Sequence, residues 1–565
     1  MCGIAGIIGK NLQHQKGEVK ARAMIQAIRH RGPDGEGFFV SDEAMLGMCR
    51  LSIIDLKSPG LCPVFYRNLK NQIVEQVLIF NGEIYNYLEL KKELKLLGHD
   101  FITTSDSEVL LYAYREWGEK CLDRLNGMFA FAIWDVQKKQ LFCARDRAGE
   151  KPFYYYFDGE QFIFASELKA LLKIVPHKTF QLPESYLALE YPTGADTFFK
   201  EIKALPPAQA LTVQNNKLKI WEYWQIDSSA KQISDSKKAL EKLDFLLCDA
   251  IKLRLRADVP SGVYLSGGID SGLIAAIAKP KVCFSVNFPY GEKYDELKYA
   301  CVIAKKIKVD EHIVVRPTEI DFKKYFREIV YFLDLPVGSF SAFALFMLAK
   351  KAKEKVKIVL GGEGVDELFS GYTRYLFLHH DEAIYQNPFL KNYRSLGEHY
   401  HSTTLKRFAH LTNRGSLPDE QLAEIIAPHF KKFSSVEHAM GYTEFKTLLV
   451  TLLQMEDRMS AAASIENRTP FLDHRIIEFA FSLAPELKIR NGQPKWLIFE
   501  LAKKYLPREV VERKEKKGLV VPMNLWLKNL GKERGEFDRS KYNQIFLNKW
   551  KQVFLKEQKS LNILL

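Results

Sequence analysis

The hydrophobic and polar positions divide the chain into two parts of different texture. In residues 1–220, strand-like apolar runs are broken by turn residues, as in QVLIFNGEIYNY (76–87) and KPFYYYFDGEQFIFAS (151–166). Such runs predict β-strands. Helical stretches such as EVLLYAYREWG (108–118) interrupt them. We therefore expect residues 1–220 to form a domain that mixes strands and helices.

A polar stretch rich in serine and lysine (225–242) separates the two parts, and the pattern behind it is different. SGVYLSGGIDSGLIAAIAK (261–279) predicts a strand, a glycine turn and a helix, and a second buried strand, KIVLGGEG (357–364), follows another helical stretch. Strands that alternate with helices favour a parallel α/β sheet. The expected segments are a domain over residues 1–220, a linker over 221–242, a second domain over 243–530 and a basic C-terminal tail over 531–565.

Length and composition are typical of a soluble globular protein with more than one domain. The chain has 565 residues, of which 47% are hydrophobic and 27% charged. No apolar run is long enough for a membrane span, and the N-terminus lacks the features of a secretion signal. The eight cysteines form no CxxC pair, which predicts reduced thiols and a cytoplasmic location without a membrane partner.

The net charge of +13 requires a nucleic-acid partner to be considered. However, the lysines are intermixed with acidic residues, and the densest basic cluster, ERKEKKG (512–518), is short. A merely basic surface serves anionic small substrates equally well. We therefore expect no nucleic-acid partner.

The segment YLSGGIDSG has the features of a phosphate-binding loop between a strand and a helix. Gly267 and Gly268 let the backbone direct its N–H groups at an anion, and Ser266 and Ser271 can donate hydroxyl hydrogen bonds. Asp270 would repel a phosphate unless a Mg²⁺ ion lay between the two. The pattern is not GxxxxGK[ST], which excludes the common P-loop, and a purely structural glycine turn is the alternative.

A second segment, IVLGGEGVDELFSGY, repeats the order of strand, glycine turn and acidic helix start. Gly361 and Gly362 lie in the turn, and Asp366 and Glu367 begin the helix, where acidic residues are also common for purely helical reasons. Glycine turns at the ends of two parallel strands converge on one crevice at the carboxyl edge of the sheet. We therefore predict an ATP–Mg²⁺ site built from both loops.

The opening MCGIAGIIG leaves two interpretations of Cys2. It is a small apolar residue at the start of a strand, or it becomes the first residue after methionine removal, so that its thiol and free α-amino group act together. A cysteine that hydrolyses an amide needs an oxyanion hole, which the Asn81 side chain and the Gly82 N–H could supply. Arg50 can bind a carboxylate and Asp106 can pair with an ammonium group; glutamine carries both charges.

Taken together, these motifs resemble those of the glutamine-hydrolysing asparagine synthetases. MCGIAG, RHRGPDGEG, NGEIYNY, RDRAGEKPFYY, FASELKALL, LSGGIDS, GEGVDELFSGY and RTPFLDHR follow in that family's order over about residues 1–530. The resemblance implies an N-terminal-nucleophile glutaminase with an αββα sandwich, followed by an α/β parallel-sheet ATP-pyrophosphatase domain with a mostly helical C-terminal part. It implies glutamine, aspartate, ATP and Mg²⁺ as ligands, and it suggests a homodimer.

The resemblance also implies a role for each matching position. In the first domain the matching residues are Cys2 as nucleophile with its freed α-amino group as base, Asn81 and Gly82 as oxyanion hole, and Arg50, Ile54, Glu83 and Asp106 as glutamine contacts. In the second they are Leu265, Ser266, Gly267, Gly268, Asp270, Ser271, Gly361 and Gly362 for ATP, Val286 for adenine, Asp270 and Asp366 for magnesium, and Gly362 and Glu363 beside the activated acceptor. Lys516 aligns with a catalytic lysine; Lys517 is the competing choice, because Leu519 replaces the aromatic residue that usually follows the glycine.

The implied reaction begins with glutamine hydrolysis at Cys2 through a thioester. Ammonia then travels inside the protein to a carboxylate, that of aspartate, which ATP has activated as an acyl-adenylate. The products are asparagine, glutamate, AMP and pyrophosphate.

Departures from the family pattern put the acceptor, rather than the catalysis, in question. Gly272 stands where Ser or Thr is usual, Gly361 replaces a frequent serine, and Leu335 replaces the glutamate of a common DEP. Asp334 then remains as the acid that could pair with the ammonium of an amino-acid substrate, in a segment (333–346) expected to line the acceptor pocket. The alternative is the same mechanism on another carboxylate, such as a sugar uronic acid. A tRNA-modifying enzyme would leave the first domain unexplained, and a non-catalytic relative fits poorly because no catalytic position is lost.

Overall fold

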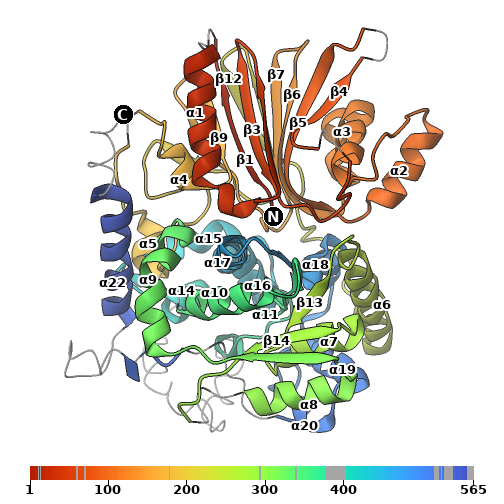
Figure 1. Ribbon diagram of the computed structural model, residues 1–565. Helices are drawn as coiled ribbons and strands as arrows, with labels where there is room; N and C mark the ends of the chain where they lie inside the picture. Colours follow the sequence, from red (N-terminus) through yellow and green to blue (C-terminus); the bar gives the residue numbers. More distant parts are fainter. Residues whose placement is uncertain are drawn as a thin grey trace.

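The computed structural model places the chain in two units, one above the other in Figure 1, with the N-terminus at their junction. The structure describes residues 1–556 except 11, 13, 59–60, 69–70, 177, 292–293, 295, 338–339, 377–402, 514–518, 520, 524 and 527–538.

The first unit is a sandwich of two antiparallel six-stranded sheets. In spatial order, one sheet contains β10 (Ile202–Ala204), β8 (Tyr154–Phe157), β9 (Phe162–Ala165), β1 (Gly3–Ile8), β3 (Ala44–Arg50) and β2 (Gly35–Val40). The other contains β12 (Lys217–Glu222), β11 (Gln209–Gln214), β7 (Gln140–Arg145), β6 (Gly127–Asp135), β5 (Val74–Ile84) and β4 (Val64–Arg67). Helices α1 (His14–Ala27) and α4 (Leu168–Leu171) cover the first sheet, and α2 (Tyr87–Leu96) and α3 (Asp106–Trp117) cover the second. These layers confirm the expected αββα sandwich.

Alternation along β5 shows why the sequence forms these layers. Val77 and Ile79 point into the core between the two sheets, where they join Ile4 of β1. Leu78 and Phe80, the residues between and after them, point into the core beneath the helices α2 and α3. Successive side chains of a strand point to opposite faces, so a strand with both faces buried needs apolar residues at consecutive positions, as in QVLIF.

The second unit is built on a sheet of five parallel strands. Their spatial order is β15 (Glu311–Val315), β14 (Val282–Val286), β13 (Ser261–Tyr264), β16 (Ile358–Leu360) and β17 (Glu466–Arg468). The strand order reverses between β13 and β16, which pair directly. In open parallel sheets, ligands bind in the crevice at such a reversal. The two glycine loops follow these two strands, as predicted.

Helices pack around this sheet. The C-terminal part of the second unit is mostly helical, as expected. The helices that precede or alternate with the strands are α6 (Ser236–Arg254), α7 (Ile269–Ala278), α8 (Leu297–Ile307), α9 (Glu319–Leu333), α10 (Ser341–Ala352) and α11 (Val365–Leu368). The later ones are α14 (Thr404–Thr412), α15 (Asp419–Phe430), α16 (Val436–Lys446), α17 (Leu448–Ala462), α18 (His474–Phe481), α19 (Trp496–Tyr505), α20 (Arg508–Val511) and α22 (Arg539–Lys551).

Two segment boundaries differ in detail from the expected residues. Strand β12 continues to Glu222, and α6 begins at Ser236, where the Asp235 side chain accepts the N–H groups of Lys237 and Lys238. Within the expected basic tail, α22 and a following π-helical turn (Gln552–Lys556) are part of the folded body.

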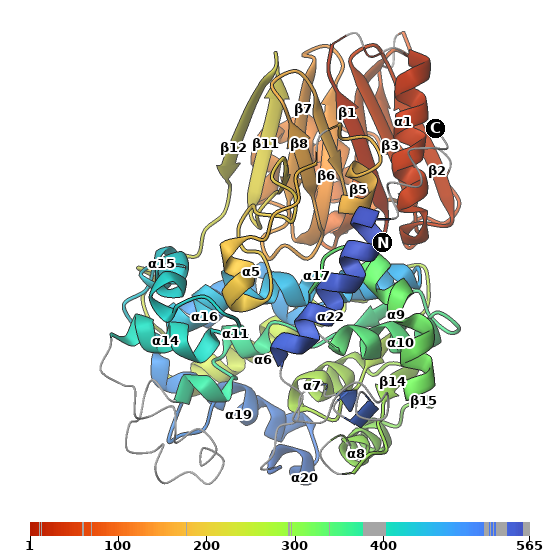
Figure 2. The same cartoon turned by 90° about the vertical axis from the view of Figure 1, so that its left-hand side faces the viewer.

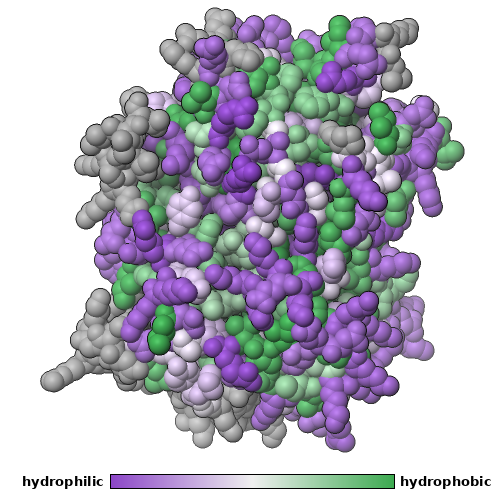
Figure 3. Space-filling model, viewed as in Figure 1, coloured by the Kyte–Doolittle hydropathy of each residue, from purple (hydrophilic) through white to green (hydrophobic). Residues whose placement is uncertain are grey.

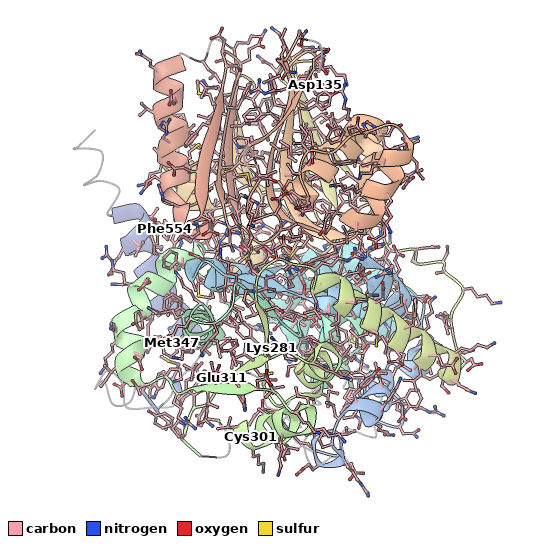
Figure 4. The ribbon with its side chains drawn as sticks, turned by 45° about the vertical axis from the view of Figure 1, so that its right-hand side comes forward. Asp135, Lys281, Cys301, Glu311, Met347 and Phe554 are labelled. Atoms are coloured by element: carbon pink, nitrogen blue, oxygen red, sulfur yellow. The ribbon has the colours of Figure 1, made fainter. Side chains whose placement is uncertain are left out.

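Helix α22 packs across the junction of the two units, as Figure 2 shows. The Trp550 ring lies 5.6 Å from that of Phe198 and 5.8 Å from that of Phe199, both in the sandwich unit. Its indole N–H donates to the carbonyl of Asp334, at the end of α9, over 3.1 Å. Phe554, labelled in Figure 4, stacks on Trp550 at the level of the junction.

Buried ion pairs also join the units. Arg31 of the sandwich unit lies 2.8 Å from Asp457 of α17 (Nη1 to Oδ2). Arg458, the next residue on α17, donates to the carbonyl of Ser166 and lies 3.5 Å from Glu167. Buried pairs of this kind are costly to break, because the remaining charge has no water around it. The relative position of the two units is therefore firmly held.

The outer surface is mostly polar, with scattered apolar residues, on the face seen in Figure 3. Among the described residues, no helix combines the length and the apolar character that a bilayer crossing demands.

Candidate active sites

Cys2 lies at the junction, one residue before the central strand β1. Its thiol is half-buried and packs against the core between the sheets, with Sγ 4.0 Å from the Leu51 carbonyl. Burial raises the pKa of this thiol, whereas the charge of Arg50 lowers it. The nitrogen of the preceding Met1 is also buried and lies 3.8 Å from Glu466 Oε2.

Asn81 and Gly82 lie on β5, which packs against β1. The Asn81 side chain is 0% exposed, yet neither its Oδ1 nor its Nδ2 has a hydrogen-bond partner among the described residues. Gly82 has φ +149°, and a Cβ there would lie 2.0 Å from the Met128 carbonyl oxygen, so only glycine fits. A buried amide without a partner costs free energy unless a ligand uses it. This is the observation expected of an oxyanion hole.

The charged residues predicted to hold glutamine come from three elements, and the charge of one of them, Arg50, acts on Cys2. Arg50 ends β3 and donates through Nη2 to the carbonyls of Ile54 (2.9 Å) and Asp55 (2.8 Å). Asp106 begins α3 and accepts the N–H of Ile84 over 2.9 Å. Burial raises the pKa of Asp106 to about 6. Burial and the neighbouring charge of Asp106 also raise the pKa of Glu83.

The second unit contributes two residues to this site that the sequence did not single out. Arg468 and Glu466 lie on β17 and pair with each other over 2.8 Å. Arg468 Nη2 lies 3.4 Å from Glu83, and its charge lowers the pKa of both Glu83 and Asp106. The signal for these residues was present, because Arg468 is the first residue of the motif RTPFLDHR and Glu466 lies two positions before it.

The first glycine loop has the geometry of an anion cradle. Gly267 has φ +84°, and a Cβ there would approach the Glu296 carbonyl to 2.8 Å. The Ser271 hydroxyl accepts the Ser266 N–H over 3.1 Å and lies 3.0 Å from the Ser266 hydroxyl. Helix α7 then begins at Ile269, and no side chain in the described part of the chain caps its N-terminus. Its first N–H groups thus remain available to phosphate oxygens. Leu265, which precedes the loop, is buried in the core.

The two predicted metal-binding acids both form an ion pair with one lysine. Lys495 Nζ is 2.7 Å from Asp270 Oδ2 and 2.7 Å from Asp366 Oδ1. Burial alone would lower the pKa of Lys495, but the charges of the two carboxylates outweigh it and raise that pKa. Sequence reasoning missed Lys495, because the segment GQPKWLIF contains no motif that separates it from a solvated lysine.

These acids fit a magnesium site of the kind that phosphates complete. Asp270 Oδ1 is buried and has no hydrogen-bond partner in the described part of the chain. Among those residues no cluster of three or more metal-ligating side chains occurs, so the protein offers two carboxylates here. Mg²⁺ in nucleotide sites is typically held by one or two carboxylates together with phosphate oxygens and water.

The structure places some, but not all, of the remaining predicted residues at this crevice. Gly362 lies beside the first loop, since a Cβ there would be 3.3 Å from the Ser271 nitrogen. Gly361 and Glu363 flank it, and Val286 ends β14, the strand next to the first loop's strand. Lys516 and Lys517 lie outside the described residues.

Asp334 cannot serve the acceptor pocket in the way the sequence suggested. It is fully buried at the junction, where its carboxylate accepts the N–H groups of Leu168 and Lys169. Lys169 Nζ and Arg458 Nη2 lie 3.4 Å and 3.6 Å from the same carboxylate. This acid therefore joins the two units, and the expectation that it pairs with a substrate ammonium is wrong.

Comparisons with known proteins agree with both halves of this description. Residues 1–224 match the family described as a glutamine amidotransferase domain, and residues 242–544 match the family described as asparagine synthase. Asparagine synthetase [glutamine-hydrolyzing] 1 of Bacillus subtilis is 32% identical, covering 94% of this chain and 88% of the relative. A putative asparagine synthetase [glutamine-hydrolyzing] of Methanocaldococcus jannaschii is 36% identical, covering 66% and 76%. Amidase chry2 of Gibberella zeae is 26% identical, covering 93% and 90%.

Proposed function

Because this chain belongs to the glutamine-hydrolysing asparagine synthetases, we propose that its two units divide the reaction between Cys2 and the crevice of the two glycine loops. The family's enzymes use glutamine, aspartate and ATP, and glutamine-dependent amide synthesis is the activity of this chain at the family level. The residue roles below, the metal and the acceptor are our proposals for this chain.

The Cys2 thiolate attacks the side-chain amide of glutamine and forms a thioester. Its α-amino group, once methionine is removed, takes the thiol proton and passes it to the leaving ammonia; an unperturbed α-amine titrates near 8, close enough to neutrality for this task. The single observation that carries this proposal is the buried Asn81 amide without a partner. Its Nδ2 and the Gly82 N–H are the donors for the oxyanion, and such donors are typically worth about a hundredfold or more in kcat.

In the other unit, the first loop and the N-terminus of α7 receive the phosphates of ATP. Lys495 supplies a positive charge between Asp270 and Asp366, beside the leaving pyrophosphate. A Mg²⁺ ion held by these two carboxylates would neutralise the charge that develops on pyrophosphate. The acceptor carboxylate attacks the α-phosphate, and ammonia then displaces AMP from the acyl-adenylate.

Aspartate is the proposed acceptor, with another carboxylate as the second candidate. The second candidate is favoured by two observations: Asp334 is committed to the junction, and one full-length relative bears the name of an amidase rather than of a synthetase. The deciding experiment supplies ATP and glutamine with aspartate, with succinate or with a hexuronic acid, and measures AMP and pyrophosphate. Pyrophosphate with aspartate but not with succinate supports asparagine synthesis. Pyrophosphate with the uronic acid alone refutes aspartate as acceptor and retains the mechanism.

A homodimer is also proposed, on the family resemblance alone. Light scattering at known protein concentration measures the mass directly, and a value of one chain refutes it.

A further inference from the structure

The first glycine loop packs directly on the first turn of helix α8. A Cβ built on Gly267 would lie 2.8 Å from the carbonyl oxygen of Glu296, the N-cap residue of α8, and 3.0 Å from the nitrogen of Ala300. Arg513 reaches this contact from 217 positions beyond Glu296, from the chain that follows helix α20. Helices α8 and α20 lie side by side (Figure 1). The loop, the start of α8 and the chain after α20 therefore meet at one arginine.

The guanidinium of Arg513 holds these three parts together. Its Nη2 donates to the carboxylate of Glu296, and its Nη1 donates to the carbonyl of Gly267 over 3.4 Å. Its Cζ lies 4.7 Å from the ring centre of Tyr299, on the first turn of α8. Only 8% of the Arg513 side chain is exposed. A guanidinium this well enclosed is costly to separate from its partners, so the Gly267 carbonyl is held in one direction.

The direction of this carbonyl fixes the direction of the next N–H group. The peptide between Gly267 and Gly268 is trans, so its C=O and N–H point to opposite sides. The Gly268 N–H donates to the Ser266 hydroxyl over 3.2 Å, and the Ser271 hydroxyl lies 3.0 Å from that of Ser266. The donors of the loop thus lie on the side away from Arg513.

Two adjacent glycines also permit the opposite orientation of this peptide. Rotating it changes ψ of Gly267 and φ of Gly268, which are residues that tolerate almost any value. Gly267 already has φ +84°, whereas Gly268 has φ −78° and would move to positive φ. In the rotated form, a carbonyl oxygen would replace the N–H among the hydroxyl groups and repel an anion. The glycine pair therefore needs a neighbour that selects the orientation with the N–H facing these groups.

We propose that Arg513 is a positioning residue for the phosphates of ATP, because its hold on the Gly267 carbonyl keeps the Gly268 N–H directed at them. The inference rests on the proposed function, which assigns this loop to the phosphates. Arg513 acts through the loop backbone and does not itself contact a phosphate. Glu296 anchors the guanidinium in turn.

Replacing the arginine should weaken the binding of phosphates. Arg513→Met keeps an apolar stem beside Tyr299 but removes every donor, so the Kd for magnesium pyrophosphate and the KM for ATP should rise about tenfold or more. Arg513→Lys retains a positive charge and a donor and should recover part of the affinity. Arg508→Met, at an exposed arginine of α20, is the matched control and should bind as the wild type does.

A second substitution tests the orientation of the peptide itself. A Cβ on Gly268 would meet only the Ser266 hydroxyl oxygen, at 3.3 Å, and alanine tolerates the present φ of −78°. Alanine disfavours the positive φ that the rotated peptide requires. In a Gly268→Ala background, Arg513→Met should therefore raise the Kd by only about threefold or less. An equal factor in both backgrounds overturns the proposal, because a merely structural role of Arg513 predicts that equality.

The experiment measures the Kd for magnesium pyrophosphate by titration calorimetry and the KM for ATP from ATP–pyrophosphate exchange. A raised Kd and KM in Arg513→Met, reduced by the alanine background, support the proposal. Unchanged values in Arg513→Met overturn it.

Glu296→Ala takes the place of Arg513→Met if the melting temperature shows that the methionine variant does not fold. It removes the carboxylate that anchors the guanidinium, so the Kd should rise about threefold or more, and an unchanged Kd again overturns the proposal. Failure of the proposed function has a different signature, since the wild-type protein itself then binds no pyrophosphate.

Discussion

Arg468 of the parallel-sheet unit lies 3.4 Å from Glu83 of the sandwich unit, and both side chains are buried. Burial raises the pKa of Glu83 and of the adjacent Asp106, and the charge of Arg468 opposes this effect on both. A residue of the synthetase unit thus helps to set the ionisation of carboxylates that we assign to glutamine binding.

This relationship predicts a pH effect on the glutaminase reaction. Asp106 must be ionised to pair with the glutamine ammonium, and its pKa is about 6, so kcat/KM for glutamine hydrolysis should fall as the pH drops through about 6. In Arg468→Gln the pKa of Asp106 rises, because an opposing positive charge is lost. The midpoint of the acid limb should then move to higher pH, measured as glutamate release. A midpoint that stays in place or moves to lower pH would contradict the assignment.

Cys2→Ala should abolish the use of glutamine and retain synthesis from added ammonium, because the two reactions occur in different units. Asparagine formation is measured with each nitrogen source. Cys301→Ala, at an exposed cysteine, is the control and should behave as the wild type. Equal loss of both activities in a folded Cys2→Ala protein would refute the two-site interpretation.

Lys495→Met, Asp270→Asn and Asp366→Asn should each lower ATP–pyrophosphate exchange by about a hundredfold or more, because each alters the charge beside the leaving group. Glutamine hydrolysis without acceptor should remain. Lys503→Met removes an exposed lysine from α19, the helix that Lys495 precedes, and should leave exchange unchanged. Normal exchange in Lys495→Met would exclude this lysine from the phosphate site.

Lys488 should make stability depend on pH in alkaline solution. It is fully buried, its Nζ has no hydrogen-bond partner in the described structure, and burial lowers its pKa from 10.5 to about 7. The unfolded chain binds the proton more tightly, so this group makes the free energy of unfolding rise with pH between about 7 and 10.5. Lys488→Met should flatten that slope.

The difference between Lys488→Met and the wild type should be largest near or below pH 7, where the variant melts at higher temperature. Melting temperatures of both proteins at pH 7, 8 and 9 test this. Parallel curves for the two proteins would mean that Lys488 does not carry the effect.

The local sequence was sufficient to predict those functional groups that lie together within one motif. The loop that contains Ser266 and Asp270 is recognisable because a strand, glycines and a helix start follow one another directly. Asn81 and Gly82 are adjacent on one strand in the same way. In these cases, backbone geometry alone brings the functional groups together.

Residues that act across large sequence separations were not predictable in this way. Lys495 reaches Asp270 from 225 positions away, and nothing in its neighbours marks it as buried. Asp334 shows the opposite error, because its place in a family-like segment suggested a substrate contact. Burial against Lys169 and Trp550, which only the fold reveals, commits it to the junction instead.

The contacts of Trp550 with Phe198 and Phe199 have a consequence for biosynthesis on the ribosome. The sandwich unit ends at β12, and translation must add roughly 330 residues more before this tryptophan is made, which takes on the order of twenty seconds to a minute. During that interval, Phe198 and Phe199 of the nascent sandwich lack the helix that covers them in the finished protein. Arg31 and Glu167 lack their ion-pair partners on α17 until that helix has been made. Chaperone binding to the nascent chain should therefore concentrate on this face and end when α22 emerges from the exit tunnel.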